Sequence, residues 1–103
     1  MQTNNMNQYL VEINLPEILD NEFLSKIPAQ RELISELMQS GVVLIYCLSE
    51  NQKNAWVCIR ANSIKEVRKI INTFPIAQYL QITIFPLTFL NVANQGINLL
   101  SLN

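Results

Sequence analysis

The chain has 103 residues, of which 50% are apolar and 15% charged, with a formal net charge of −1. This length fits one domain, and the charge leaves no positive field for nucleic acid or for an anionic membrane surface. Histidine does not occur, so the commonest general base and transition-metal ligand is missing, and we expect neither a metal nor a cofactor. The two cysteines fit a reduced, cytoplasmic protein.

The first 40 residues predict a leader, a strand and a helical region. Residues 1–7 are polar and uncharged, so we expect a disordered leader and no signal peptide. Apolar side chains alternate along residues 9–15, which predicts a strand. A helical region is expected over residues 16–40, kinked or divided at Pro28, and Gly41 should end it as the C′ residue.

Two apolar runs follow, over residues 42–48 and 54–61. The polar stretch 49–53 between them has the composition of a turn. We therefore predict a hairpin of two strands.

The next segment opens with Ser63 and Glu66, which have the spacing of a capping box at the start of a helix. That helix is expected to stop at Pro75, and residues 79–85 to form a fourth strand. The order β-α-β-β-α-β predicts an α+β, ferredoxin-like domain over residues 8–90. In this fold a four-stranded antiparallel sheet carries two helices on one face.

The hairpin strands are apolar at nearly every position, which is typical of a sheet covered on both faces. Two helices cover one face only, and leaving the other in water would forgo roughly 10 kcal/mol. We therefore predict a homodimer in which two sheets pack face to face. The apolar, uncharged tail, residues 91–103, is expected to pack on a neighbouring subunit and to permit a higher oligomer.

The segment from Phe74 to Ile84 carries a family resemblance. It stands where the muconolactone isomerase family has a stretch like Leu-Pro-Leu-Phe-Pro-Tyr-Met-Asp-Ile-Glu-Val, and Leu15-Pro16, Glu32-Leu33 and Gly41 fall in the same register. The chain thus resembles this family, within the dimeric α+β barrel superfamily, from Tyr9 to Leu87. The resemblance implies the fold of that superfamily. It also implies a cofactor-free activity, the transfer of a proton within a small unsaturated acid or lactone.

The chain departs from the family in its pocket. Family members look like Gly-x-x-x-His-Leu-Trp-Arg after the first helix, and here Ile45 stands for the His and Leu48 for the Arg. Gln30 replaces an acidic residue of the first helix, and Gln81 and Thr83 replace two acidic residues of the last strand. The resemblance therefore implies a divergent member with an apolar pocket.

Glu32 is the carboxylate that this register places near the pocket. It is the candidate catalytic base, because proton transfer beside a carbonyl needs a base within hydrogen-bond reach. A solvated residue on the helix rim is the other interpretation. Arg31 or Arg60 could hold a ligand carboxylate, although Arg60 could instead pair with Glu12 or lie in water.

Three aromatic residues, Tyr46, Trp56 and Tyr79, could line a cleft for an unsaturated ligand. They could equally be core or interface packing. We interpret Cys47 and Cys58 as buried structural cysteines, since a reactive thiol needs an electropositive setting.

Two functions remain open at this point. The chain could be an isomerase-like enzyme acting on a small unsaturated acid or lactone, or a non-catalytic module that binds a small apolar ligand or assembles with itself. A cofactor-independent oxygenase is a third hypothesis, based only on the Trp and Tyr content. An enzyme cleft should enclose Glu32 together with a second polar side chain.

Overall fold

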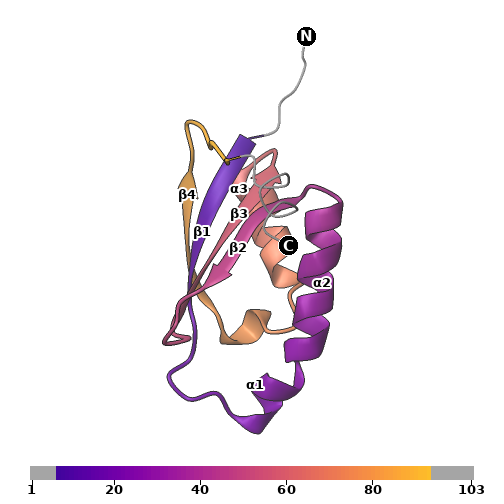
Figure 1. Ribbon diagram of the computed structural model, residues 1–103, viewed down its shortest axis with the longest axis vertical. Helices are drawn as coiled ribbons and strands as arrows, with labels where there is room; N and C mark the ends of the chain where they lie inside the picture. The colour runs from indigo at the N-terminus through magenta and orange to yellow at the C-terminus, as the bar shows by residue number, and fades with distance from the viewer. Residues whose placement is uncertain (1–6, 94–103) are drawn as a thin grey trace, which may run out of the picture.

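A computed structural model describes residues 7–93 and contains one four-stranded antiparallel sheet (Figure 1). The strand order is β2-β3-β1-β4. The strands are β1 (Asn7–Asn14), β2 (Val43–Leu48), β3 (Asn54–Ala61) and β4 (Gln81–Pro86).

Three α-helices and one short 3-10 helix complete the fold: α1 (Asn21–Ser25), α2 (Ile27–Gln39), α3 (Ile64–Asn72) and η1 (Ala77–Tyr79). In space α2 lies against β2 and α3 against β3, and both helices cover the same face of the sheet (Figure 1). This arrangement confirms the predicted α+β, ferredoxin-like fold.

The core lies between that face and the helices. Val11, Val57, Ile59 and Val67 have no solvent exposure. They come from β1, β3 and α3, where the apolar residues recur at the period of each element, two in the strands and about 3.6 in the helix. Alternation along the strands therefore places one set of side chains in this core and the other set on the opposite face.

The first helical region differs from its prediction, which began at residue 16. The chain is not helical before Asn21, and the Asp20 carboxylate caps α1 by accepting a hydrogen bond of 2.9 Å from the Phe23 amide. The division between α1 and α2 falls at Lys26, ahead of Pro28. Pro28 lies in the first turn of α2, where its missing N–H breaks no helical hydrogen bond.

Gly41 ends α2 as predicted. Its φ of +80° is in the left-handed region, which glycine adopts at low cost. The Gly41 amide donates to the Met38 carbonyl at 3.1 Å and the Val42 amide to the Leu37 carbonyl at 2.9 Å. This is the Schellman pattern, and it turns the chain directly into β2.

The Ser63 cap of α3 is also confirmed, and Glu66 reaches back to Asn62, one residue before the N-cap. The Ser63 hydroxyl accepts from the Glu66 amide at 3.1 Å, and the Glu66 carboxylate accepts from the Asn62 amide at 2.6 Å. The fourth strand was predicted from residue 79 and instead begins at Gln81, because Tyr79 belongs to η1.

The opposite face of the sheet carries the alternate side chains. The register places Leu10 beside both Cys58 and Phe85. Arg60 lies opposite Gln8, whereas Glu12 lies opposite Trp56, so the pairing of Arg60 with Glu12 is wrong. This face carries Leu10, Trp56 and Phe85 together with the polar Gln8, Glu12 and Arg60, and the dimer prediction depends on it. The predicted leader and tail lie mostly outside the described residues and stay predictions.

Candidate functional site

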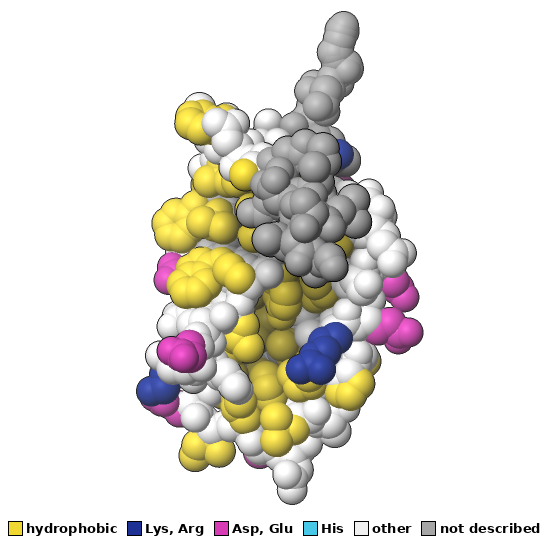
Figure 2. All heavy atoms as spheres, viewed as in Figure 1, with side chains coloured by type: hydrophobic (Ala, Val, Ile, Leu, Met, Phe, Trp, Pro, Cys, Tyr) yellow, Lys and Arg dark blue, Asp and Glu magenta, His cyan; other side chains and the backbone are white. Residues whose placement is uncertain are grey.

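A cavity of about 270 Å³ lies between the sheet and the helices α1 and α2. Figure 2 shows it as a hollow lined with hydrophobic side chains. Its walls are mostly aliphatic and aromatic, with four polar side chains among them. The lining residues are Ile13, Leu15, Leu19, Phe23, Leu24, Ile27, Gln30, Arg31, Tyr46, Leu48, Gln52, Ala55, Phe74, Ile76 and Leu80.

A β-bulge in β2 decides which of its side chains reach the cavity. The pairing with β3 shifts between Val43 and Ile45, after which Tyr46 lies opposite Val57 and Leu48 opposite Ala55. Because side chains alternate between the faces of a strand, the inserted residue turns Tyr46 and Leu48 toward the helices. Without it, Ile45 and Cys47 would face the cavity.

Gln30 is the buried polar residue of the site. Its side chain is 3% exposed, and neither its amide nitrogen nor its amide oxygen has a hydrogen-bond partner among the described residues. An unsatisfied amide in an apolar setting costs roughly 1–3 kcal/mol. Such a group in a native structure calls for an explanation, and a ligand is one.

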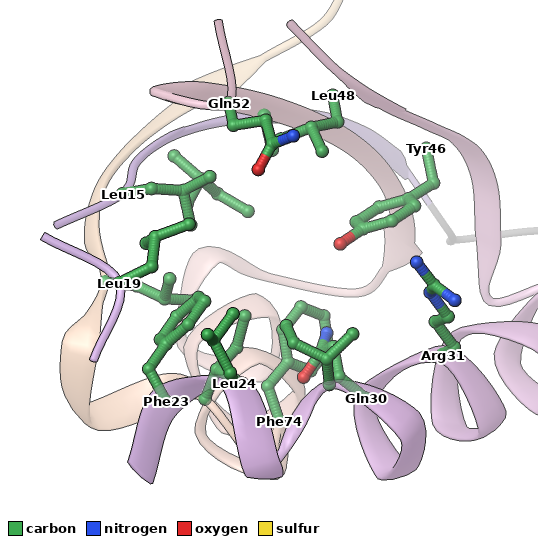
Figure 3. Close-up of a pocket in the computed structure, with 15 residues that line it drawn as sticks. Leu15, Leu19, Phe23, Leu24, Gln30, Arg31, Tyr46, Leu48, Gln52 and Phe74 are labelled. Carbon is green, nitrogen blue, oxygen red and sulfur yellow. The ribbon is translucent and has the colours of Figure 1, made fainter. Parts of the chain in front are cut away.

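Tyr46 and Arg31 lie next to each other beside this amide (Figure 3). Burial raises the pKa of the Tyr46 phenol, while hydrogen bonding toward the Gln30 amide and the positive charge of Arg31 oppose that rise. The Gln30 and Tyr46 side chains are thus close to pairing, although they do not reach hydrogen-bond geometry. The phenol therefore stays un-ionised at neutral pH and can both donate and accept a hydrogen bond. Its hydroxyl points into the cavity, as does the Gln52 side chain from the far side (Figure 3).

The structure brings together two of the predicted site residues, Arg31 and Tyr46, at this cavity. Glu32 follows Arg31 on α2 but is exposed and does not line the cavity. Trp56 and Arg60 lie on the opposite face of the sheet, since they alternate with buried residues of β3. Tyr79 lies in η1, with its ring edge-on to Phe23 at a centroid separation of 5.3 Å.

The two cysteines have different environments. Cys58 is fully buried, as predicted, and burial raises the pKa of its thiol. Cys47 is exposed, so its predicted burial is wrong. Both lie on the face of the sheet that is turned away from the cavity.

Gln30 and Gln52 were not among the predicted site residues. A signal for Gln30 was present in the sequence: it stands four residues before Ile34 and three before Leu33, so it extends the apolar stripe of its helix. A polar residue at a core position is a candidate for function. Gln52 lies in the turn after β2, and no comparable pattern marks it.

Within residues 7–93, no three or more Cys, Asp or Glu side chains gather as a metal site would require. Over the same range, no helix has the length and apolar character needed to cross a membrane.

The sheet, its helices and the cavity between them define a ferredoxin-like α+β protein with an apolar pocket. The sequence pattern of the family described as muconolactone delta-isomerase matches residues 8–90. The chain therefore belongs to the muconolactone delta-isomerase family, as a divergent member.

Several solved structures resemble this chain, including the following two. An uncharacterised protein from Thermotoga maritima is 10% identical, with a TM-score of 0.50 over 81% of this chain and 99% of its own. A protein of unknown function from Bacteroides thetaiotaomicron, described as a possible oxidoreductase, is 16% identical, with a TM-score of 0.43 over 82% and 100% of the two chains. The first shows the fold alone. No curated protein matches the chain significantly.

Proposed function

We propose that the chain binds a small, largely apolar molecule in the cavity between α2 and the sheet, without acting on it chemically. The observation that carries this proposal is the Gln30 side chain in the wall of an otherwise apolar cavity, where its amide nitrogen and oxygen are buried without a hydrogen-bond partner among residues 7–93. No carboxylate is among the described residues of the lining. The features of the cavity thus favour binding over proton transfer.

The cavity is large enough for a ring system. An apolar cavity of about 150 Å³ in another protein binds benzene, so 270 Å³ suits a molecule of two fused rings or a short branched chain. Aliphatic walls contribute about 25 cal/mol for each Å² of apolar ligand surface removed from water. The polar side chains would then fix the orientation of the ligand.

A mouth-blocking variant tests the proposal. Leu48 lines the cavity and is 52% exposed, so Leu48→Trp adds bulk at the opening without disturbing the core. We expect wild-type protein to bind naphthalene in ligand-observed NMR, and Leu48→Trp to weaken that binding about tenfold. Ile18→Trp, at a residue 80% exposed and outside the lining, is the matched control. Equal binding by all three proteins would place the ligand elsewhere.

A second candidate function is isomerisation with Glu32 as the base, which membership of the isomerase family supports. This role predicts that Glu32→Gln abolishes turnover of muconolactone, measured by ultraviolet absorbance, and leaves the melting temperature nearly unchanged. Glu36→Gln, one helical turn further along α2, is the control, because Glu36 is also exposed. Equal rates in the two variants would refute a catalytic Glu32.

We also propose that two chains form a homodimer through the open face of the sheet. Leu10, Trp56 and the 45%-exposed Phe85 would be buried there. Phe85→Lys places a charge on this face, and we expect it to convert a dimer at micromolar concentration into a monomer in sedimentation velocity. Ile18→Lys adds the same charge away from the sheet and should remain dimeric. A monomeric wild type would end the proposal.

A further inference from the structure

The Gln30 side chain offers a specific pairing edge to a ligand. Its carboxamide presents a hydrogen-bond donor on the nitrogen and an acceptor on the oxygen, side by side. Both atoms are buried without a hydrogen-bond partner in the described part of the chain, and the residue lines the cavity (Figure 3). A ligand group that satisfies the whole edge must therefore present an acceptor and a donor next to each other.

Few ligand groups meet this condition. A lactam, a primary carboxamide and an un-ionised carboxylic acid each carry an acceptor beside a donor. Lactones, esters, ketones and carboxylates offer acceptors alone, so the Gln30 oxygen would stay unpaired in their complexes. A binding site that pairs a buried polar group discriminates strongly against analogues that lack the matching group.

The charge distribution of the walls points to a neutral ligand. Among the lining residues Arg31 is the charged one, and it is exposed to solvent beside Tyr46. An anion at the level of Gln30 would lose its hydration without gaining a buried countercharge, which is costly. The apolar remainder of the walls suits a hydrocarbon or aromatic body.

We propose that the cavity selects neutral, largely apolar molecules that carry a lactam, carboxamide or un-ionised carboxylic acid group. Gln30 is the residue that forms hydrogen bonds with this group. This proposal rests on the proposed binding function. Tyr46 supplies a further hydroxyl within the same space. The selectivity is then a property of one side chain and can be measured by changing one atom of a ligand.

Quinolin-2(1H)-one and coumarin form the matched pair for the test. They have the same fused-ring shape and carbonyl, and differ in that the lactam N–H of the first is a ring oxygen in the second. We expect wild-type protein to bind quinolin-2(1H)-one at least tenfold more tightly than coumarin by isothermal titration calorimetry. In Gln30→Met the two affinities should become equal within about twofold. Gln39→Met, at an exposed glutamine of the same helix, should keep the wild-type preference.

The outcomes separate the two proposals. Equal affinities for wild-type protein, or a preference that survives in Gln30→Met, would overturn the assignment of Gln30 while leaving the binding function intact. If quinolin-2(1H)-one, coumarin and naphthalene all fail to bind folded protein, the binding function itself fails. A preference for coumarin would show that Gln30 is satisfied internally and would also overturn the assignment.

Discussion

Replacing Gln30 by methionine is expected to raise the free energy of unfolding of the ligand-free protein by about 1–3 kcal/mol. The gain arises because the variant removes a buried amide that has no hydrogen-bond partner among the described residues. Methionine has a similar length and flexibility and can fill the same space without strain. The native chain would therefore give up stability at this position, as binding sites commonly do.

Urea denaturation followed by circular dichroism measures this difference. Gln39→Met is the control, because Gln39 lies on the same helix with its side chain in water, and a surface change of this kind stays within about 0.5 kcal/mol. A Gln30→Met variant less stable than the wild type would mean that a bound water already satisfies the amide. The comparison is made at one protein concentration so that any self-association contributes equally.

Phe74→Ala should lower the free energy of unfolding by about 3–5 kcal/mol. Phe74 is 3% exposed, follows α3 and lies both in the core and in the cavity wall. Its amide donates to the Ile71 carbonyl at 2.9 Å, which fixes the chain where it leaves the helix toward η1. Because the total free energy of unfolding of a domain is only about 5–15 kcal/mol, the variant is expected to be barely stable enough to fold.

The matched measurement uses Ile18→Ala, which truncates an exposed apolar side chain and should change stability by less than about 0.5 kcal/mol. If Phe74→Ala has already lost its cooperative transition at 25 °C, Phe74→Leu supplies an intermediate loss. A Phe74→Ala variant as stable as Ile18→Ala would mean that the cavity wall closes around the missing ring.

Residue patterns were sufficient for most of the fold. Alternation in residues 9–15 and the two apolar runs of the hairpin fixed three strands, and the Ser63–Glu66 capping box fixed the start of α3. These signals depend only on neighbouring residues, so they can be recognised without knowing how the rest of the chain folds. Gly41 was predictable for the same reason, since its left-handed conformation is specified within one helical turn.

The site depended on features that no local pattern marks. The bulge in β2 turns Tyr46 and Leu48 toward the helices, and a continuous apolar run gives no sign of it because either face could be buried. The first helix begins at Asn21, after its cap Asp20, and not at Pro16. It ends at Ser25, and Lys26 separates it from α2. Gln30 departs from the family and extends the apolar stripe of its helix, but only the structure shows that its amide is buried without a hydrogen-bond partner among the described residues.

The break at Lys26 has a kinetic consequence. Helix α1 is five residues long and buries one side chain, Phe23, yet it supplies part of the cavity wall. So short a helix has little stability of its own, and Lys26 joins it to α2 without a side-chain cap. Amide protons of residues 21–25 should thus exchange with solvent faster than those of α3 and slow down when a ligand is bound. The part of the cavity wall that α1 supplies is therefore expected to be less stable than the part supplied by the sheet.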